Sequence, residues 1–271
     1  MLNMTVITSA LELGCIYSLV ALAGHPFLAL PVAMLSGAAA GFITALLQTR
    51  LGVPSILSGI ITNTGLYTVN LAVMGFSSNV NLLKAETLFT VLRDKVGGGV
   101  LYRLAPAFVI SAVMCGAVIL FLNTRIGLSI RATGDNPDMV RASSINTAFT
   151  ITLGLCISNS MTALSGAVLA QYQRTADINL GTGMVVIGLA SLIIGEALLP
   201  KGKLWLKAAG AILGSIVYRF IIAVALRLDL PSECLKLISA VIVALAIVGP
   251  YVSRRLAEDR RRRAARQKGD R

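Results

Sequence analysis

Long apolar runs separated by polar stretches set the pattern of this chain. A helix needs about 20 apolar residues to cross the roughly 30 Å hydrocarbon core of a bilayer. Lipid cannot satisfy exposed backbone groups, and the runs are too long for barrel strands, so helices are expected. The pattern predicts an all-α, polytopic transmembrane helix bundle of about eight spans. The expected spans cover residues 4–24, 26–47, 54–75, 105–122, 148–170, 183–199, 206–226 and 235–252.

The composition supports a membrane protein and narrows its chemistry. Of the 271 residues, 56% are hydrophobic and 13% are charged, which excludes an ordinary soluble domain and a disordered chain. The four cysteines lack paired spacing and His25 is the single histidine, so neither a disulfide framework nor a histidine-based metal or catalytic cluster is expected. The sequence has no G-x-x-x-x-G-K-S/T phosphate loop. We therefore expect a protein that is not an enzyme and binds no cofactor itself.

The distribution of charge predicts the orientation. The net charge is +12, and residues 254–271 hold nine basic and three acidic side chains. Cytoplasmic loops carry an excess of lysine and arginine, so this tail, residues 124–147 and Arg50 are expected on the cytoplasmic side, with residues 76–104 and 171–182 outside. A basic tail after a final span typically lies near anionic lipid, and no nucleic acid partner is expected. The remainder, residues 1–253, is expected to form one transmembrane domain.

The outer loop at residues 76–104 has a pattern of its own. Its residues 81–95 have the pattern of an amphipathic helix lying on the membrane surface. Three glycines at 97–99 follow and predict a hinge.

One polar, basic stretch, residues 124–147, is longer than a connection between spans requires. Within it Asn136 can cap a helix, Pro137 suits the first helical position and Asp138 favours the positive end of a helix. We predict a short surface helix over residues 137–144. Its face is expected to carry Met139, Val140, Ser143 and Arg141. The stretch is either a docking surface or a solvated connection whose arginines only fix orientation.

Polar side chains inside apolar spans are costly and usually face a cavity or a partner side chain. Asn63 with Thr64, and Asn159, lie near the middle of their spans, where we expect them to line a pathway. Glu196 is a further candidate, although nearby lysines are equally compatible with a structural ion pair. Asparagine can also join two helices without any transport role.

Glycines four residues apart predict close helix packing at two places. Gly37 with Gly41, and Gly210 with Gly214, put two small residues on one face of a helix. We expect neighbouring helices to approach closely at both pairs.

Two segments, RATGDNPDMVRASSIN at 131–146 and GLASLIIGEAL at 188–198, carry a resemblance to a known family. They resemble the permease subunits of ATP-binding cassette (ABC) importers in the branched-chain amino acid and sugar permease family, and are closest to a branch of uncharacterised amino acid importers. The resemblance implies a type II ABC importer-like fold in the inner (plasma) membrane and a pathway for a small polar solute, such as an amino acid. It also implies that residues 124–147 couple the permease to an ATPase. The implied coupling residues are Arg131, Gly134, Asn136, Pro137, Met139 and Arg141.

The same resemblance implies several partners. They are an ABC ATPase subunit that binds ATP and Mg²⁺, a second permease subunit in a homodimer or heterodimer, an extracytoplasmic solute-binding protein and the lipid bilayer. Family members place a further pathway-lining helix after the first span, whereas Gly24-His25-Pro26 joins two apolar runs directly here, which implies that a segment is absent. A truncated, non-transporting permease and a stand-alone secondary transporter or channel remain alternatives.

Overall fold

The computed structural model describes residues 26–83, 86–91, 101–199 and 204–227. Contacts divide the chain into two compact units, Met1–Thr182 and Gly183–Arg271, each with its own packing. The elements described in the first unit are α2 (Ala29–Thr49), α3 (Ser55–Val73), β1 (Asn79–Asn81), α5 (Leu101–Leu122), α6 (Arg125–Asp135), α7 (Pro137–Ala142), α8 (Thr147–Gln173) and β2 (Thr175–Asp177). The helix α9 (Leu180–Leu198) starts at the end of the first unit, and α10 (Leu204–Arg227) lies in the second.

The prediction of an all-α membrane bundle is confirmed. Five described helices are long and apolar enough to cross a membrane, namely Ala29–Thr49, Ser55–Val73, Ala105–Leu122, Thr147–Gln173 and Leu204–Val224. The apolar part of α9 is shorter, at Ile187–Leu198. The expected spans at 4–24 and 235–252 lie outside the described residues. Pro26 lies in a turn before α2, so the proline does not interrupt that helix.

The centre of the first unit is the contact between α2 and α8. These helices run antiparallel, because Gly37 meets Asn159 and Ala163 whereas Gly41 meets Leu155 and Cys156. A methyl group on Gly37 would lie 2.5 Å from the Ala163 Cβ and 2.5 Å from the Asn159 carbonyl oxygen. Glycine here lets the two backbones approach closely, which confirms the predicted packing role of Gly37 and Gly41.

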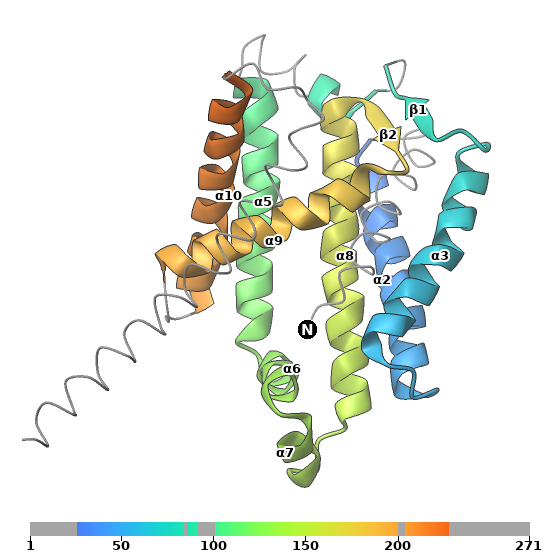
Figure 1. Cartoon of the computed structure of the whole chain (residues 1–271), viewed down its shortest axis with the longest axis vertical. Coiled ribbons are helices and arrows are strands. Elements are labelled where there is room, and N and C mark those ends of the chain that lie inside the picture. The colour runs from blue at the N-terminus through green and yellow to red at the C-terminus, as the bar shows by residue number, and fades with distance from the viewer. Residues whose placement is uncertain (1–25, 84–85, 92–100, 200–203, 228–271) are drawn as a thin grey trace, which may run out of the picture. The chain divides into compact units, whose positions relative to one another are not determined.

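Polar side chains join α2 to α3 on another face. The Thr44 hydroxyl donates to the Thr62 hydroxyl at 3.1 Å, and the Gln48 side-chain amide donates to the Ser58 hydroxyl at 2.9 Å. Each helix supplies two residues spaced by four, so both bonds lie on one face of each helix. The helix α2 thus lies between α3 and α8, as Figure 1 shows.

A two-stranded ribbon forms at the end of the bundle opposite to α6 and α7 (Figure 1). β1 pairs with β2 in antiparallel register, with Val80 opposite Ala176. The pairing brings the segments after α3 and after α8 to one end, as expected for two loops on the same side of the membrane. It also shows that the helix predicted over 81–95 is wrong at its start, because Asn79–Asn81 is a strand and described helical residues begin only at Leu88. Residues 97–99 lie outside the described part.

The second unit contains a close contact between α9 and α10. A methyl group on Gly210 would lie 3.1 Å from the Gly195 carbonyl oxygen, and one on Gly214 would collide with the Ser191 carbonyl oxygen. The prediction of close packing at Gly210 and Gly214 is therefore confirmed.

Candidate functional site

The polar stretch between α5 and α8 folds into two helices rather than one. Thr124 caps α6, and its hydroxyl oxygen accepts a hydrogen bond from the Gly127 backbone N–H at 3.2 Å. Gly127 is buried against the backbone at Phe121 and Leu122, which brings the start of α6 close to the end of α5. The sequence predicts a helix only from Pro137 onward, so α6 (Arg125–Asp135) is seen only in the structure.

The helix α7 begins as its sequence predicts. The Asn136 side-chain oxygen accepts hydrogen bonds from the backbone N–H groups of Asp138 and Met139, each at 3.1 Å. Pro137 occupies the first turn, where a missing N–H costs no helical bond. The helix ends at Ala142, two residues earlier than predicted, and Ser144 has a positive φ of 61° that cannot continue it.

Side chains fasten both short helices to the start of α8. The Arg141 Nε donates to the Thr147 hydroxyl at 3.0 Å, and the hydroxyls of Thr133 and Thr150 share a hydrogen bond of 2.9 Å. Val140 is 2% exposed. Val140 was expected on the docking face, and that expectation is wrong because its side chain packs inward. The helices α6 and α7 are therefore braced against α8.

The six residues implied in coupling lie close together on the exposed side of α6 and α7. Met139 is 60% exposed and is the large apolar side chain that α7 presents to solvent. Arg131, Gly134, Asn136, Pro137 and Arg141 are also exposed. Arg141 additionally lies 3.7 Å from Asp138, an exposed pair that adds little stability. The site thus combines an exposed apolar residue with cations on a braced support.

The family is decided by sequence comparison. The sequence model of the family described as branched-chain amino acid transport system / permease component matches residues 3–248. The chain belongs to this family. The family consists of permease components of transport systems.

Individual relatives of this permease include proteins named for different solutes. A tyrosine transport system permease protein of Clostridioides difficile is 37% identical over 219 residues, which cover 80% of this chain and 71% of that protein. An uncharacterized protein of Rickettsia prowazekii is 29% identical over 226 residues, covering 82% of this chain and 78% of the relative. A ribose import permease protein of Haemophilus influenzae is 23% identical over 229 residues, covering 82% and 68%. No solved structure matches the permease.

The candidate pathway residues of the permease occupy different helices. Asn159 is 1% exposed, donates its amide N–H to the Leu155 carbonyl at 2.9 Å, and lies against Gly41 in the contact of α2 with α8. Asn63 is half-buried on α3, and Thr64 beside it is exposed. Glu196 is exposed on α9. The structure thus puts Asn63 and Asn159 on helices on opposite sides of α2, and their role in a pathway stays a prediction.

Asn70 on α3 is a buried polar side chain that lacks hydrogen-bond partners among the described residues. It is fully buried at 0% exposure, and neither its amide nitrogen nor its amide oxygen has a hydrogen-bond partner among the residues that the structure describes. A buried unpaired amide costs about 1–3 kcal/mol. The burial of Asn70 is visible only in the structure, because it depends on the neighbours of α3 and not on the sequence around Asn70.

Other polar residues of the permease were not singled out from sequence. Gln171 is 1% exposed, accepts a hydrogen bond from the Leu88 backbone N–H at 3.0 Å and donates to the Pro26 carbonyl at 3.4 Å. It thereby ties the C-terminal end of α8 to two other segments. The contact that Thr44 and Gln48 make could have been predicted from sequence. They are polar residues four positions apart in an apolar run, so they lie on one face of a helix.

Proposed function

We propose that this permease is the membrane-spanning subunit of an ABC importer for an amino acid, and that an ATPase subunit docks on α6 and α7. A second permease subunit would complete the membrane part, and a solute-binding protein would approach the end that carries the β1–β2 ribbon. ATP and Mg²⁺ bind to the ATPase subunit. The permease lies in the inner membrane with the α6–α7 end and the tail at 254–271 in the cytoplasm, as the positive charges of these segments favour.

The docking proposal rests on one observation, the exposed methionine on a braced helix. Met139 is 60% exposed, whereas Val140 next to it is 2% exposed and holds α7 against its own subunit. Methionine adapts to irregular apolar grooves, so Met139 suits insertion into a partner. The bonds from Arg141 to Thr147 and from Thr133 to Thr150 would carry a displacement of α7 and α6 to α8.

The importance of α8 follows from its packing. In its most apolar stretch 39% of the residues are buried, against 6% in the corresponding stretch of α5. A movement that begins at Thr147 would therefore act on the helix around which the first unit packs. Through the two side-chain hydrogen bonds, this connection would give an ATPase a route to the membrane part.

One relative, the tyrosine transport system permease, supports an amino acid as the solute class. The tyrosine transport system permease shares more identity with this chain than the ribose import permease does, at 37% against 23%. We propose that the solute passes polar side chains of α3, α8 and α9, with Asn63, Thr64, Asn159 and Glu196 as contacts. Amide and carboxylate groups can bind the ammonium and carboxylate groups of an amino acid.

The test uses the full permease reconstituted in nanodiscs with its ATPase subunit. Complete burial of a methionine side chain contributes about 1.5–3 kcal/mol. Met139 is 60% exposed, so the ATPase could bury about that share of the side chain, and Met139→Asp should weaken ATPase binding about tenfold. Stimulated ATP hydrolysis should fall with it, while membrane insertion stays normal. Leu51→Asp is the matched control, because Leu51 follows α2 outside α6 and α7, is 65% exposed, and its substitution introduces the same charge.

Each proposal has its own contradicting result. Unchanged ATPase binding by Met139→Asp, or an equal loss in Leu51→Asp, would return α6 and α7 to a solvated connection. Solute uptake by the permease alone, without an ATPase, would favour the stand-alone transporter. Uptake of ribose but no amino acid by the complete system would overturn the proposed solute class.

A further inference from the structure

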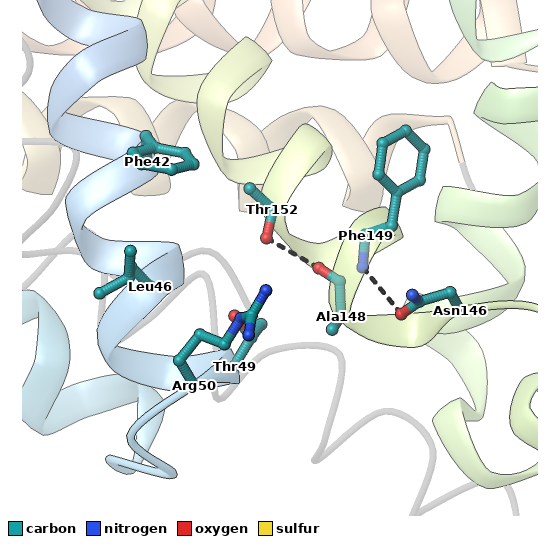
Figure 2. A pocket seen from close by; sticks show the side chains of 8 residues that line it. All are labelled: Phe42, Leu46, Thr49, Arg50, Asn146, Ala148, Phe149 and Thr152. Carbon is teal, nitrogen blue, oxygen red and sulfur yellow. Dashed lines mark hydrogen bonds between the residues drawn. The ribbon is translucent and has the colours of Figure 1, made fainter.

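A cavity of about 510 Å³ opens between the end of α2 and the start of α8. Figure 2 shows its two walls, one from each helix. Phe42 and Leu46 line the α2 side, and Thr152 and Phe149 line the α8 side. Arg50, Thr49, Asn146 and Ala148 complete the lining.

The cavity exists because the helix contact changes along its length. At Gly37 and Gly41 the backbones of α2 and α8 nearly touch. Beyond Gly41 the side chains of α2 are larger, and Phe42 and Leu46 remain 52% and 42% exposed. The space between the helices is therefore not filled by the side chains of the residues that the structure describes. Its apolar walls lie in the last two turns of a membrane-spanning helix, and Arg50 marks where the polar boundary begins.

The electrostatics of the cavity favour an anion. Arg50 extends its guanidinium group from α2 toward Ala148 on α8 (Figure 2). None of the eight lining residues is acidic, and within the described residues Arg50 forms no ion pair. The 27-residue helix α8 begins at this cavity, with the Asn146 side chain capping the Phe149 N–H at 3.2 Å. A cation and the positive end of a long helix thus face one space.

We propose that this cavity binds an anionic phospholipid of the cytoplasmic leaflet. Arg50 and the start of α8 hold the headgroup phosphate, and one acyl chain lies along Phe42, Leu46 and Phe149. The volume is within the range of small-molecule sites and accommodates a headgroup with part of a chain. A basic peptide would be repelled by Arg50, and a free phosphate would leave the apolar wall uncovered. The choice of the cytoplasmic leaflet rests on the orientation proposed above, whereas binding of the lipid does not require transport activity.

The cavity lies beside the segment to which α7 is fastened, so a bound lipid would affect the structure there. Asn146 and Ala148 flank Thr147, the residue that accepts the hydrogen bond from Arg141 of α7. A lipid that bridges Arg50 and the start of α8 would hold α2 beside the segment to which α7 is fastened. Binding of the lipid should therefore raise the thermal stability of the permease, and anionic lipids should do so more than neutral ones.

The test measures binding of phosphatidylglycerol and phosphatidylcholine to the full permease in detergent, by native mass spectrometry and by thermal unfolding. The wild-type protein should bind phosphatidylglycerol more tightly and gain more thermal stability from it. Arg50→Gln should lower phosphatidylglycerol affinity roughly tenfold, since a charge-assisted hydrogen bond is lost. Arg50→Lys retains the charge and should keep most of the preference. Arg125→Gln removes an exposed cation at the same end, outside the cavity, and should change nothing.

A second variant tests the cavity itself. Ala148→Phe fills the space and keeps Arg50, so binding of both lipids at this site should be lost. Equal affinity for the two lipids, equal losses in Arg50→Gln and Arg125→Gln, or unchanged binding in Ala148→Phe would each overturn the proposal. Stabilisation by inorganic phosphate equal to that by phosphatidylglycerol would assign a small-anion site instead. Purification of the detergent-solubilised permease as a dimer that excludes lipid from this cavity would assign the surface to a second copy.

Discussion

Gly37→Ala is the substitution whose effect follows most directly from the geometry of the permease. The added methyl would lie 2.5 Å from both the Ala163 Cβ and the Asn159 carbonyl oxygen, whereas ordinary contacts begin at 3.4 Å. The helices α2 and α8 would have to separate by roughly 1 Å along their closest contact. Backbone atoms form part of the clash, so a change of side-chain rotamer cannot relieve it.

Two contributions of opposite sign determine the magnitude. Replacing a glycine by alanine inside a helix stabilises by about 0.5–1 kcal/mol, and overpacking a core costs about 1–3 kcal/mol. We expect a net loss of about 1 kcal/mol in Gly37→Ala, which lowers the melting temperature by about 2–4 °C. Gly65→Ala on α3 is the matched control, because the added methyl would meet no described atom of a neighbouring segment within 4 Å. That control should show only the stabilising contribution.

Thermal unfolding of the purified permease in one detergent measures both variants. The double variant Gly37→Ala with Ala163→Gly removes one of the two clashing methyls and should recover part of the loss, a coupling that a double-mutant cycle quantifies. Wild-type or higher stability of Gly37→Ala, or the same shift in Gly65→Ala, would refute the close contact between α2 and α8.

Three further expectations concern the coupling helix, a buried amide and the topology. Asn136→Ala removes the cap of α7, which costs about 1 kcal/mol, and should reduce ATPase stimulation, whereas Asn136→Asp retains an acceptor oxygen and should preserve it. Asn70→Leu removes an unpaired buried amide and should raise stability by about 1–3 kcal/mol, so a lower melting temperature would show that Asn70 has a partner. A cysteine replacing Asn79 on β1 should react with an impermeant maleimide in intact cells, and one replacing Ser144 should react only after permeabilisation. Reversed labelling would contradict the positive-inside orientation.

The sequence by itself determined those features of the permease that depend on residues close together along the chain. Apolar runs long enough to cross a bilayer located the helices that the structure describes as α2, α3, α5, α8 and α10, because lipid forces such runs to be helical. The start of α7 was equally predictable, since Asn136 bonds to N–H groups two and three residues away. The glycines at 37 and 41 indicated close packing through their spacing alone.

Only the tertiary structure decided which residues meet across the bundle. Asn79–Asn81 became a strand through pairing with Thr175–Asp177, and no local pattern in an amphipathic stretch encodes a partner that distant in sequence. Val140 and Met139 are adjacent apolar residues of α7, yet the fold buries Val140 and leaves Met139 exposed. The cavity beside Arg50 likewise arises where two antiparallel helices stop touching. The physical reason is common to all three, because burial and cavities depend on distances between segments, and a linear pattern specifies only the faces that seek contact.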